Sequence, residues 1–177
     1  PPRRQKLCLF YVADNNEQDK IKTQDDLRDA FIKTAAAETF LAWHYYKSKK
    51  DDAEKILKQG EIPPEFFRSM FYTYGDYRDI FFDTDISEKT EEGHVKKAID
   101  CIGKFFSKDG GKSGSGLSRQ EWWETNGPDI WKGMLCGLSH HIDEHEREKL
   151  TKNKDYQYST VASTLEDFAS RPQFLRW

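Results

Sequence analysis

The chain has 177 residues, of which 33% are charged and 14% aromatic, and its formal net charge is −3. This length fits one compact domain, and the slightly acidic balance argues against a general nucleic-acid binder. No stretch approaches the ~20 apolar residues of a transmembrane helix, so we expect no direct membrane insertion. The aromatic side chains can still build a core, because each large ring buries much apolar area.

The N-terminal part of the chain predicts an irregular segment followed by a long helix. The apolar run over residues 7–12 favours a short strand or a buried extended segment, and a polar loop is expected over residues 14–22. Thr23 then begins a helix, since Asp26 stands three residues later as in a capping box. Apolar residues recur at steps of three and four, and the helix should end near residues 47–50.

Two helices separated by a glycine–proline turn are predicted next. Residues 51–58 favour a short helix that ends at Gly60. The pair Pro63 and Pro64 opens a longer helix rich in Phe and Tyr, which covers more than one face and should be central. Gly75 interrupts this pattern, and the close approach of a neighbouring helix would explain it.

The second half of the chain continues the helical pattern. Residues 88–106 predict a helix, and the Gly/Ser/Lys-rich residues 108–116 predict a flexible loop. Ser118 and Glu121 form a second capping box, which begins a helix containing two adjacent tryptophans.

That tryptophan helix is expected to break at residues 126–127 and to restart at Pro128. Residues 143–154 predict a charged helix end or loop. Residues 155–171 carry a weak signal, with a short helical turn at 165–169. Because strand alternation is almost absent, the sequence predicts an all-α helix bundle with irregular loops.

The histidines near residue 140 form the one polar cluster with metal-ligand residue types, His140, His141 and His145 with Asp143 and Glu144. His141 and His145 stand at i, i+4, but the His-Glu-x-x-His order of a metalloprotease is missing. A solvated helix end is the favoured interpretation, and we expect neither a metal nor a cofactor.

Other patterns of chemical interest are also weak. Residues 111–113 read Gly-Lys-Ser, but a phosphate-binding loop needs glycine at position 106, where Phe stands, and a preceding strand. The three cysteines, Cys8, Cys101 and Cys136, leave at least one thiol free or paired outside this chain. Their spacing fits no zinc pattern and their apolar surroundings favour inert thiols, so nothing in the sequence supports an enzyme.

An acid–base–acid set interrupts the aromatic central helix, and it consists of Asp76, Arg78 and Asp79. Its favoured interpretation is a packed core with one buried ion pair. Glu38 falls on the apolar face of the first long helix and would need a partner if buried, for which Arg78 is a candidate.

Six stretches match a known family in the family's own order: residues 1–9, 35–40, 70–80, 120–123, 130–136 and 172–177. On these stretches the chain resembles the Duffy-binding-like domain of the malaria parasite's variant erythrocyte membrane adhesins. Two short sequences look most like the beta class of these domains: Tyr-Gly-Asp-Tyr at residues 74–77 and Trp-Lys-Gly-Met at residues 131–134.

The resemblance implies a helical adhesion domain on the extracellular face of the infected erythrocyte, within a larger membrane-anchored protein. Full domains have three subdomains. Residues 1–22 resemble the end of the first, mostly loop, and residues 23–154 resemble the second, a helix bundle. Residues 155–177 resemble a linking loop and the start of the third, so the apolar tail over residues 172–177 is expected to be a handover between subdomains in a piece of a larger protein.

The resemblance also bears on the cysteines and on the partner. Cysteines of the family tend to form disulfides, so Cys8, Cys101 and Cys136 are possible disulfide cysteines, some with partners outside this chain. Beta-class domains are often adhesive for the endothelial intercellular adhesion molecule, an immunoglobulin-like receptor, whereas other members bind different host proteins or sulfated glycans. The implied partner is therefore a host cell-surface protein.

The residues proposed for receptor contact are Tyr156, Tyr158, Val161, Leu165 and Phe168, although the favoured alternative is that they pack their segment on the bundle. A sulfated glycan would instead use the basic clusters near Arg3 and Lys47, and its affinity would fall steeply with salt. In a third interpretation the chain is a structural scaffold, and the binding site lies outside it.

Overall fold

The computed structural model describes residues 7–176, except residues 88, 91–92 and 107–115. Helices carry the fold over these residues, and no strand occurs among them, which confirms the all-α prediction. The elements are α2 (Phe10–Ala13), α3 (Asn15–Gln18), α4 (Gln24–Lys47), α5 (Ala53–Lys58), α6 (Pro64–Phe82), α7 (His94–Gly103), α8 (Arg119–Leu138), α9 (Glu144–Lys152), the 3-10 turn η1 (Lys154–Tyr156), α10 (Tyr158–Ser170) and α11 (Gln173–Arg176).

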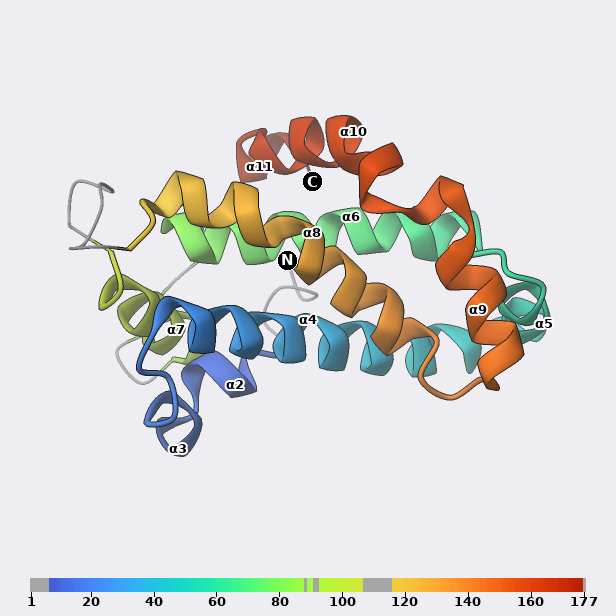
Figure 1. Cartoon of the computed structure of the whole chain (residues 1–177), viewed down its shortest axis with the longest axis horizontal. Coiled ribbons are helices and arrows are strands. Elements are labelled where there is room, and N and C mark those ends of the chain that lie inside the picture. Colours follow the sequence, from blue (N-terminus) through green and yellow to red (C-terminus); the bar gives the residue numbers. More distant parts are fainter. Residues whose placement is uncertain (1–6, 88, 91–92, 107–115, 177) are drawn as a thin grey trace.

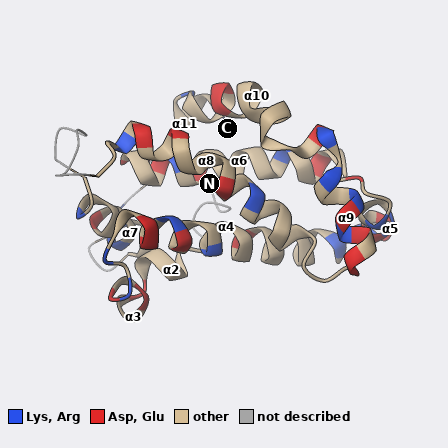
Figure 2. Cartoon of the chain, viewed as in Figure 1, with Lys and Arg blue, Asp and Glu red and all other residues tan. Residues whose placement is uncertain are grey.

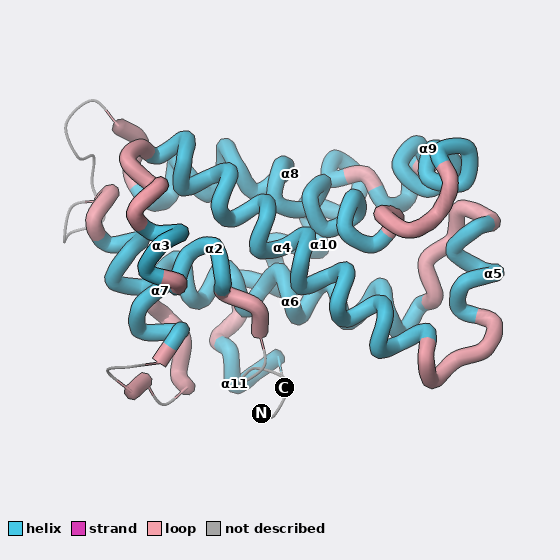
Figure 3. The backbone as a smooth tube through the Cα atoms, turned by 90° about the horizontal axis from the view of Figure 1, so that it is seen from below, coloured by secondary structure: helices cyan, strands magenta, loops and turns pink. Residues whose placement is uncertain are grey.

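Three long helices, α4, α6 and α8, form the centre of an elongated bundle (Figure 1). The contact between α4 and α8 is the most extensive of the bundle, and α10 lies along α6 on the side away from α4. Most of the short helices lie at the two ends, α2, α3 and α7 at one and α5 and α9 at the other, whereas α11 contacts α6, as the view from below also shows (Figure 3). No helix of the described residues is long and apolar enough to cross a membrane.

Sequence signals at helix starts are confirmed. Thr23 and Ser118 each accept a hydrogen bond from the backbone N–H three residues on, and the acidic residue there returns one, so both capping boxes are complete. α6 begins at Pro64, and Gly60 after α5 has φ of +86°, a left-handed conformation that glycine adopts at no steric cost.

The prediction of a strand or buried extended segment over residues 7–12 is wrong from residue 10 onward, whereas residues 7–9 are non-helical, with Leu7 and Leu9 buried. Residues 10–13 form α2, which buries Val12 and Ala13 and contacts α4 and α7. The predicted polar loop also contains a helix, α3, whose first turn is held by Asp14: its carboxylate accepts hydrogen bonds from the N–H groups of Asn16 (2.9 Å) and Glu17 (3.2 Å).

The predicted break in the tryptophan helix does not occur, because α8 runs without interruption from Arg119 to Leu138. Burial of Trp122 and Trp123 before Pro128, and of Trp131 after it, offsets the ~3 kcal/mol that an internal proline costs a helix. A tertiary contact with α6 requires glycine at position 127, because a Cβ there would lie 2.6 Å from the Tyr74 hydroxyl oxygen.

The C-terminal third is more helical than the sequence suggested. Asp143 and Glu146 form a third capping box, which makes residues 144–152 a separate helix, α9. The expected linking loop after residue 155 is wrong, since residues 158–170 form α10. Its Val161, Leu165 and Ala169 are buried at i, i+4 and i+8, an apolar stripe that packs on α6.

The helix expected over residues 88–106 is shorter, because α7 covers only His94–Gly103. The predicted loop over residues 108–116 and the Gly-Lys-Ser at 111–113 lie almost wholly outside the described residues.

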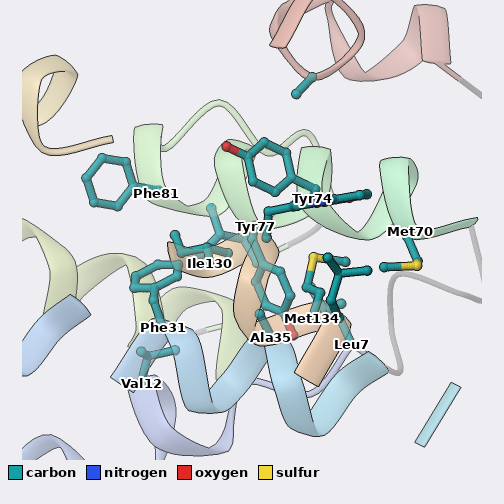
Figure 4. Close-up of a cluster of buried hydrophobic side chains, with 14 of the residues drawn as sticks. Leu7, Val12, Phe31, Ala35, Met70, Tyr74, Tyr77, Phe81, Ile130 and Met134 are labelled. Carbon is teal, nitrogen blue, oxygen red and sulfur yellow. The ribbon is translucent and has the colours of Figure 1, made fainter. Parts of the chain in front are cut away.

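The core is built from aromatic rings contributed by all three long helices. Phe31 of α4, Tyr77 and Phe81 of α6, and Ile130 of α8 converge in one buried cluster (Figure 4). The Phe81 ring stacks on Trp122, with centroids 4.7 Å apart and planes 20° from parallel. A few large rings thus fill the space between helices, as the composition predicted.

Candidate functional site

The segment predicted to contact a receptor is α10 with the turn before it. The structure buries three of its five candidate side chains, Tyr156, Val161 and Leu165. The Tyr156 hydroxyl donates a hydrogen bond to the Glu61 carboxylate (2.9 Å) and accepts one from the Ile62 N–H (3.0 Å). These three residues therefore fasten the segment to the bundle, and they present no free face to a partner.

The other two candidates, Tyr158 and Phe168, are half-buried on α10. The Phe168 ring meets the rings of Tyr72 and Phe71 edge-on, with centroids 5.0 and 6.0 Å away. The Tyr158 hydroxyl donates to Oε1 of Glu166 (2.9 Å). Both side chains also keep surface toward solvent, so of the five they alone combine packing with access.

Glu166 of α10 accepts hydrogen bonds from two tyrosines, of which Tyr74 on α6 links the two helices and Tyr158 belongs to α10 itself. The Tyr74 hydroxyl donates to its Oε1 at 2.5 Å, beside the bond from Tyr158. Burial and the Glu166 charge raise the pKa of Tyr74 well above its ordinary range and that of Tyr158 to about 12, so both remain donors at any physiological pH. On the other oxygen of Glu166, Arg78 Nε lies 3.8 Å away.

The ion-pair partners differ from those predicted. Arg78 lies beside Glu166 and over the Phe82 ring, with 4.6 Å between the guanidinium carbon and the ring centroid. Glu38 accepts a hydrogen bond from the Cys8 N–H (2.7 Å). Sequence alone could not predict the Arg78–Glu166 contact, because no spacing in the chain relates α6 to α10.

The buried ion pair expected near residues 76–79 does exist, and its cation comes from the tail. Arg176 of α11 is fully buried and donates hydrogen bonds to both oxygens of Asp79, while Asp76 Oδ1 lies 3.8 Å from Nη2. A Cβ at Gly75 would lie 3.2 Å from Arg176 Nε, so the glycine makes room for a side chain of the neighbouring helix α11.

The burial pattern of α11 is the reverse of that of an ordinary surface helix, because its polar side chains are buried and its apolar side chains are exposed. Gln173 and Arg176 are buried, and Gln173 hydrogen-bonds the Ile86 N–H (2.8 Å) and Asp85 (2.8 Å). Phe174 and Leu175 are more than half exposed. The tail is thus anchored by its polar side chains.

The histidines do not form a metal site. His141 lies before α9 and is largely buried, whereas His140 and His145 are exposed, so the predicted i, i+4 pair does not act together. The described residues contain no group of three or more His, Cys, Asp or Glu side chains that could hold a metal ion. His141 instead accepts a hydrogen bond at Nε2 from the Trp43 indole N–H (3.2 Å).

Stability should depend on pH through His141. Burial, with the positive charge of Lys47, lowers the pKa of His141 below its ordinary 6.5, although Glu54, 3.9 Å from Nε2, opposes the shift. The unfolded chain therefore takes up a proton below pH 6.5 that the folded chain resists, and stability falls as the pH drops through that value.

This pH effect can be isolated with a His141→Gln variant. We expect the melting temperature of the variant to fall less between pH 7.5 and 5.5 than that of the unmodified chain. His145→Gln, exposed on α9, is the matched control and should keep the original slope. An unchanged slope in His141→Gln would assign the pH dependence to other groups.

The three cysteines are free thiols in this structure and form no disulfide with one another. Burial raises the pKa of Cys8 and of Cys101, which fits the prediction of inert thiols. Cys136 is exposed on α8, so for this residue the expected apolar surroundings are wrong. Partners outside this chain remain a proposal from the family resemblance.

A groove that the sequence did not predict lies between α8, α9 and the start of α10. We call it the α8–α10 groove; its volume is about 590 Å3, and its surface is mostly apolar. Pro128 and Tyr158, which are half-buried, supply accessible apolar surface to its lining, whereas the lining residues Trp131 and Leu135 are buried. A volume of this size is typical of ligand-binding pockets.

The lysines near residue 47 are largely neutralised by carboxylates. Lys47 Nζ lies 3.5 Å from Glu54, and Lys50 Nζ lies 3.2 Å from Glu65. Lys49 lies over the Tyr45 ring, 5.9 Å from its centroid. The other basic cluster, around Arg3, lies outside the described residues.

A family model described as the Duffy binding domain matches residues 1–176. The chain belongs to the Duffy-binding domain family. Comparison with curated proteins and with solved structures finds no match. Duffy-binding domains are extracellular adhesion modules that bind receptors on host cells, and they are not enzymes. The helical bundle is consistent with this assignment.

In a family of adhesion modules the α10 segment matters because it carries residues that were predicted to contact the receptor. Two signals were present in the sequence and were missed: the i, i+4, i+8 spacing of Val161, Leu165 and Ala169, and the lone Arg176 in an apolar tail. The first predicts a helix and the second a buried cation, because an apolar segment that carries one arginine needs a carboxylate partner when it packs.

Proposed function

We propose that the chain is a cell-adhesion module that binds a protein receptor on host endothelial cells. An immunoglobulin-like receptor is favoured, with the intercellular adhesion molecule first. We place the chain in the beta class of the malaria parasite's variant adhesins, on the outer face of the infected erythrocyte membrane. The observation that carries this proposal is the family match over residues 1–176, to which the resemblance of residues 74–77 and 131–134 adds the class.

The character of the surface favours a protein over a sulfated glycan. Two lysines of the 47–50 cluster lie beside carboxylates, and positive and negative side chains are interspersed along the helices (Figure 2). Large apolar side chains are exposed instead, with Leu41 and Tyr45 one turn apart on α4. Exposed apolar and aromatic groups serve protein–protein contacts, whereas a glycan sulfate needs unpaired cations.

Within the predicted contact segment we assign different roles to the candidate residues. Tyr158 and Phe168 would face the receptor, and Tyr156, Val161 and Leu165 would hold α10 in place. We also retain the division at residues 22 and 154 as a proposal, with α10 and α11 as a helical start of the third subdomain.

Binding to immobilised receptors at two salt concentrations tests this proposal. We expect saturable binding to the ectodomain of the intercellular adhesion molecule, with a dissociation constant that changes less than about tenfold between 0.05 and 0.5 M NaCl. A contact built on apolar anchors is little screened, whereas one built on exposed charges weakens strongly.

Heparin and chondroitin sulfate on parallel surfaces are the controls. Binding to these glycans alone, with a steep loss at high salt, would establish the sulfated-glycan alternative. If the chain binds none of these surfaces while a longer piece of the same protein binds the receptor, the chain is a scaffold and the proposal fails.

A further inference from the structure

The α8–α10 groove has a distinct chemical polarity along its length. Asp129, Lys132 and Cys136 are exposed and line one wall in helical order on α8. At 1.5 Å per residue, Asp129 and Cys136 lie about 10 Å apart along the helix axis. The acidic end of the groove is thus the N-terminal end of this wall, and the basic side chain lies in its middle.

The opposite wall adds a second cation near the C-terminal end of α8. The Arg147 guanidinium donates hydrogen bonds to the carbonyl oxygens of Ser139 (3.2 Å), His140 (3.3 Å) and Ile142 (3.4 Å). Among the ion pairs of the described residues, none joins a carboxylate to Arg147 or to Lys132. Two positively charged side chains therefore line this half of the groove, and Asp129, the one carboxylate of the lining, lies at the other end.

Most other polar atoms of the lining are already used. The Trp131 indole N–H donates to the Tyr156 carbonyl (2.8 Å), and the Tyr158 hydroxyl donates to Glu166. The Gln157 side-chain amide donates to the Thr151 carbonyl. The lining therefore offers apolar surface with few free donors, which suits an apolar side chain better than a hydroxyl-rich sugar.

We propose that the α8–α10 groove docks an extended loop of the receptor in which an apolar side chain stands next to a carboxylate. The apolar side chain would lie against Pro128 and Tyr158, which are partly exposed, and the carboxylate would face Lys132 and Arg147. Asp129 would repel the same carboxylate at the other end, which sets the direction of the loop. This inference rests on the proposed function in one respect, that the partner is a protein.

Three single variants at exposed positions test the groove without touching the core. Lys132→Glu reverses the central charge, and Ser159→Trp places a large ring at the rim. Lys152→Glu is the control, since it makes the same charge change on α9 outside the lining. Circular dichroism and melting temperature confirm that each variant folds.

Two probes are used with each variant. The first is the ectodomain of the intercellular adhesion molecule on a biosensor. The second is N-acetyl-Leu-Glu-amide, with N-acetyl-Leu-Gln-amide for comparison, titrated at millimolar concentration into the 15N-labelled chain. We expect Lys132→Glu and Ser159→Trp to weaken receptor binding at least tenfold, and Lys152→Glu to change it less than twofold. The Leu-Glu probe should shift the amide resonances of lining residues about threefold more than the Leu-Gln probe.

The outcomes separate the groove from the receptor assignment. Receptor binding that survives both groove variants unchanged, without any shift of lining resonances by the Leu-Glu probe, overturns the groove proposal and leaves the proposed function standing. Shifts of lining resonances that Lys132→Glu abolishes, in a chain that binds no immunoglobulin-like receptor, support the groove and remove the receptor assignment. If the receptor does not bind and the Leu-Glu probe shifts no lining resonance, the groove proposal and the receptor assignment are both overturned.

Discussion

A Gly137→Ala variant is expected to lose about 3 kcal/mol or more of its free energy of unfolding. A Cβ at this position would lie 2.2 Å from the carbonyl oxygen of Ala36 and 2.8 Å from its carbonyl carbon. Both atoms belong to the backbone of α4, so no side-chain rotation can relieve the overlap, and the two helices must separate. Overpacking usually costs 1–3 kcal/mol, and a clash with backbone belongs at or above the upper end of that range.

The neighbouring glycines provide graded controls for this measurement. A Cβ at Gly133 would meet the Ile32 methyl group at 2.9 Å and its carbonyl oxygen at 3.1 Å, so Gly133→Ala should cost less. A Cβ at Gly103 of α7 would meet nothing within 4 Å, and Gly103→Ala should stabilise by about 0.5–1 kcal/mol, since alanine favours the helix.

Urea unfolding followed by tryptophan fluorescence measures all three variants. Trp43, Trp122, Trp123 and Trp131 are buried and should report the loss of the core. A Gly137→Ala variant as stable as Gly103→Ala would contradict a backbone contact between α4 and α8 at this position.

The contact between α4 and α8 illustrates which features of the fold can be predicted from the sequence and which cannot. The periodicity and caps of both helices were visible, because these are local signals that depend on neighbours in the chain. The crossing itself was not, since Gly133 and Gly137 act only when another helix comes close. The expected break at residues 126–127 failed for the same reason: local glycine and proline signals yielded to tertiary burial of the tryptophans.

The candidate site was predicted less well than the fold. The segment around α10 was identified from the family resemblance, but its helix was missed and three of its five candidate residues proved to be buried. The α8–α10 groove combines side chains from α8, α9 and α10 that no sequence spacing relates. Its two cations, Lys132 and Arg147, become significant only after the ion-pair partners of other charges are known.

Arg176→Met is expected to cost about 3–5 kcal/mol of unfolding free energy, which would make it the most destabilising change outside the helix crossing. The guanidinium is fully buried, and the Asp76 and Asp79 side chains beside it are 0% and 5% exposed. It also donates to the carbonyl oxygens of Ala169 (2.9 Å) and Arg171 (2.7 Å), so its loss removes the polar anchor of α11 as well.

The exposed pair next to it is the matched control. Arg171 Nη2 lies 2.5 Å from Oδ2 of Asp167, which stands one helical turn earlier, and both side chains are more than half exposed. Arg171→Met should therefore cost less than about 0.5 kcal/mol, because water already solvates both charges and salt screens them. Thermal unfolding in 0.15 M salt compares the two arginines under the same conditions.

A double variant decides whether buried charge causes the Arg176 effect. Adding Asp79→Asn to Arg176→Met removes one of the two buried carboxylate charges left near the missing cation. If electrostatics dominates, the double variant should be more stable than Arg176→Met alone. Fully additive losses would instead place the cost in the packing and hydrogen bonds of α11. The tail would then be held by its fit against Gly75, and the charge of Arg176 would matter little.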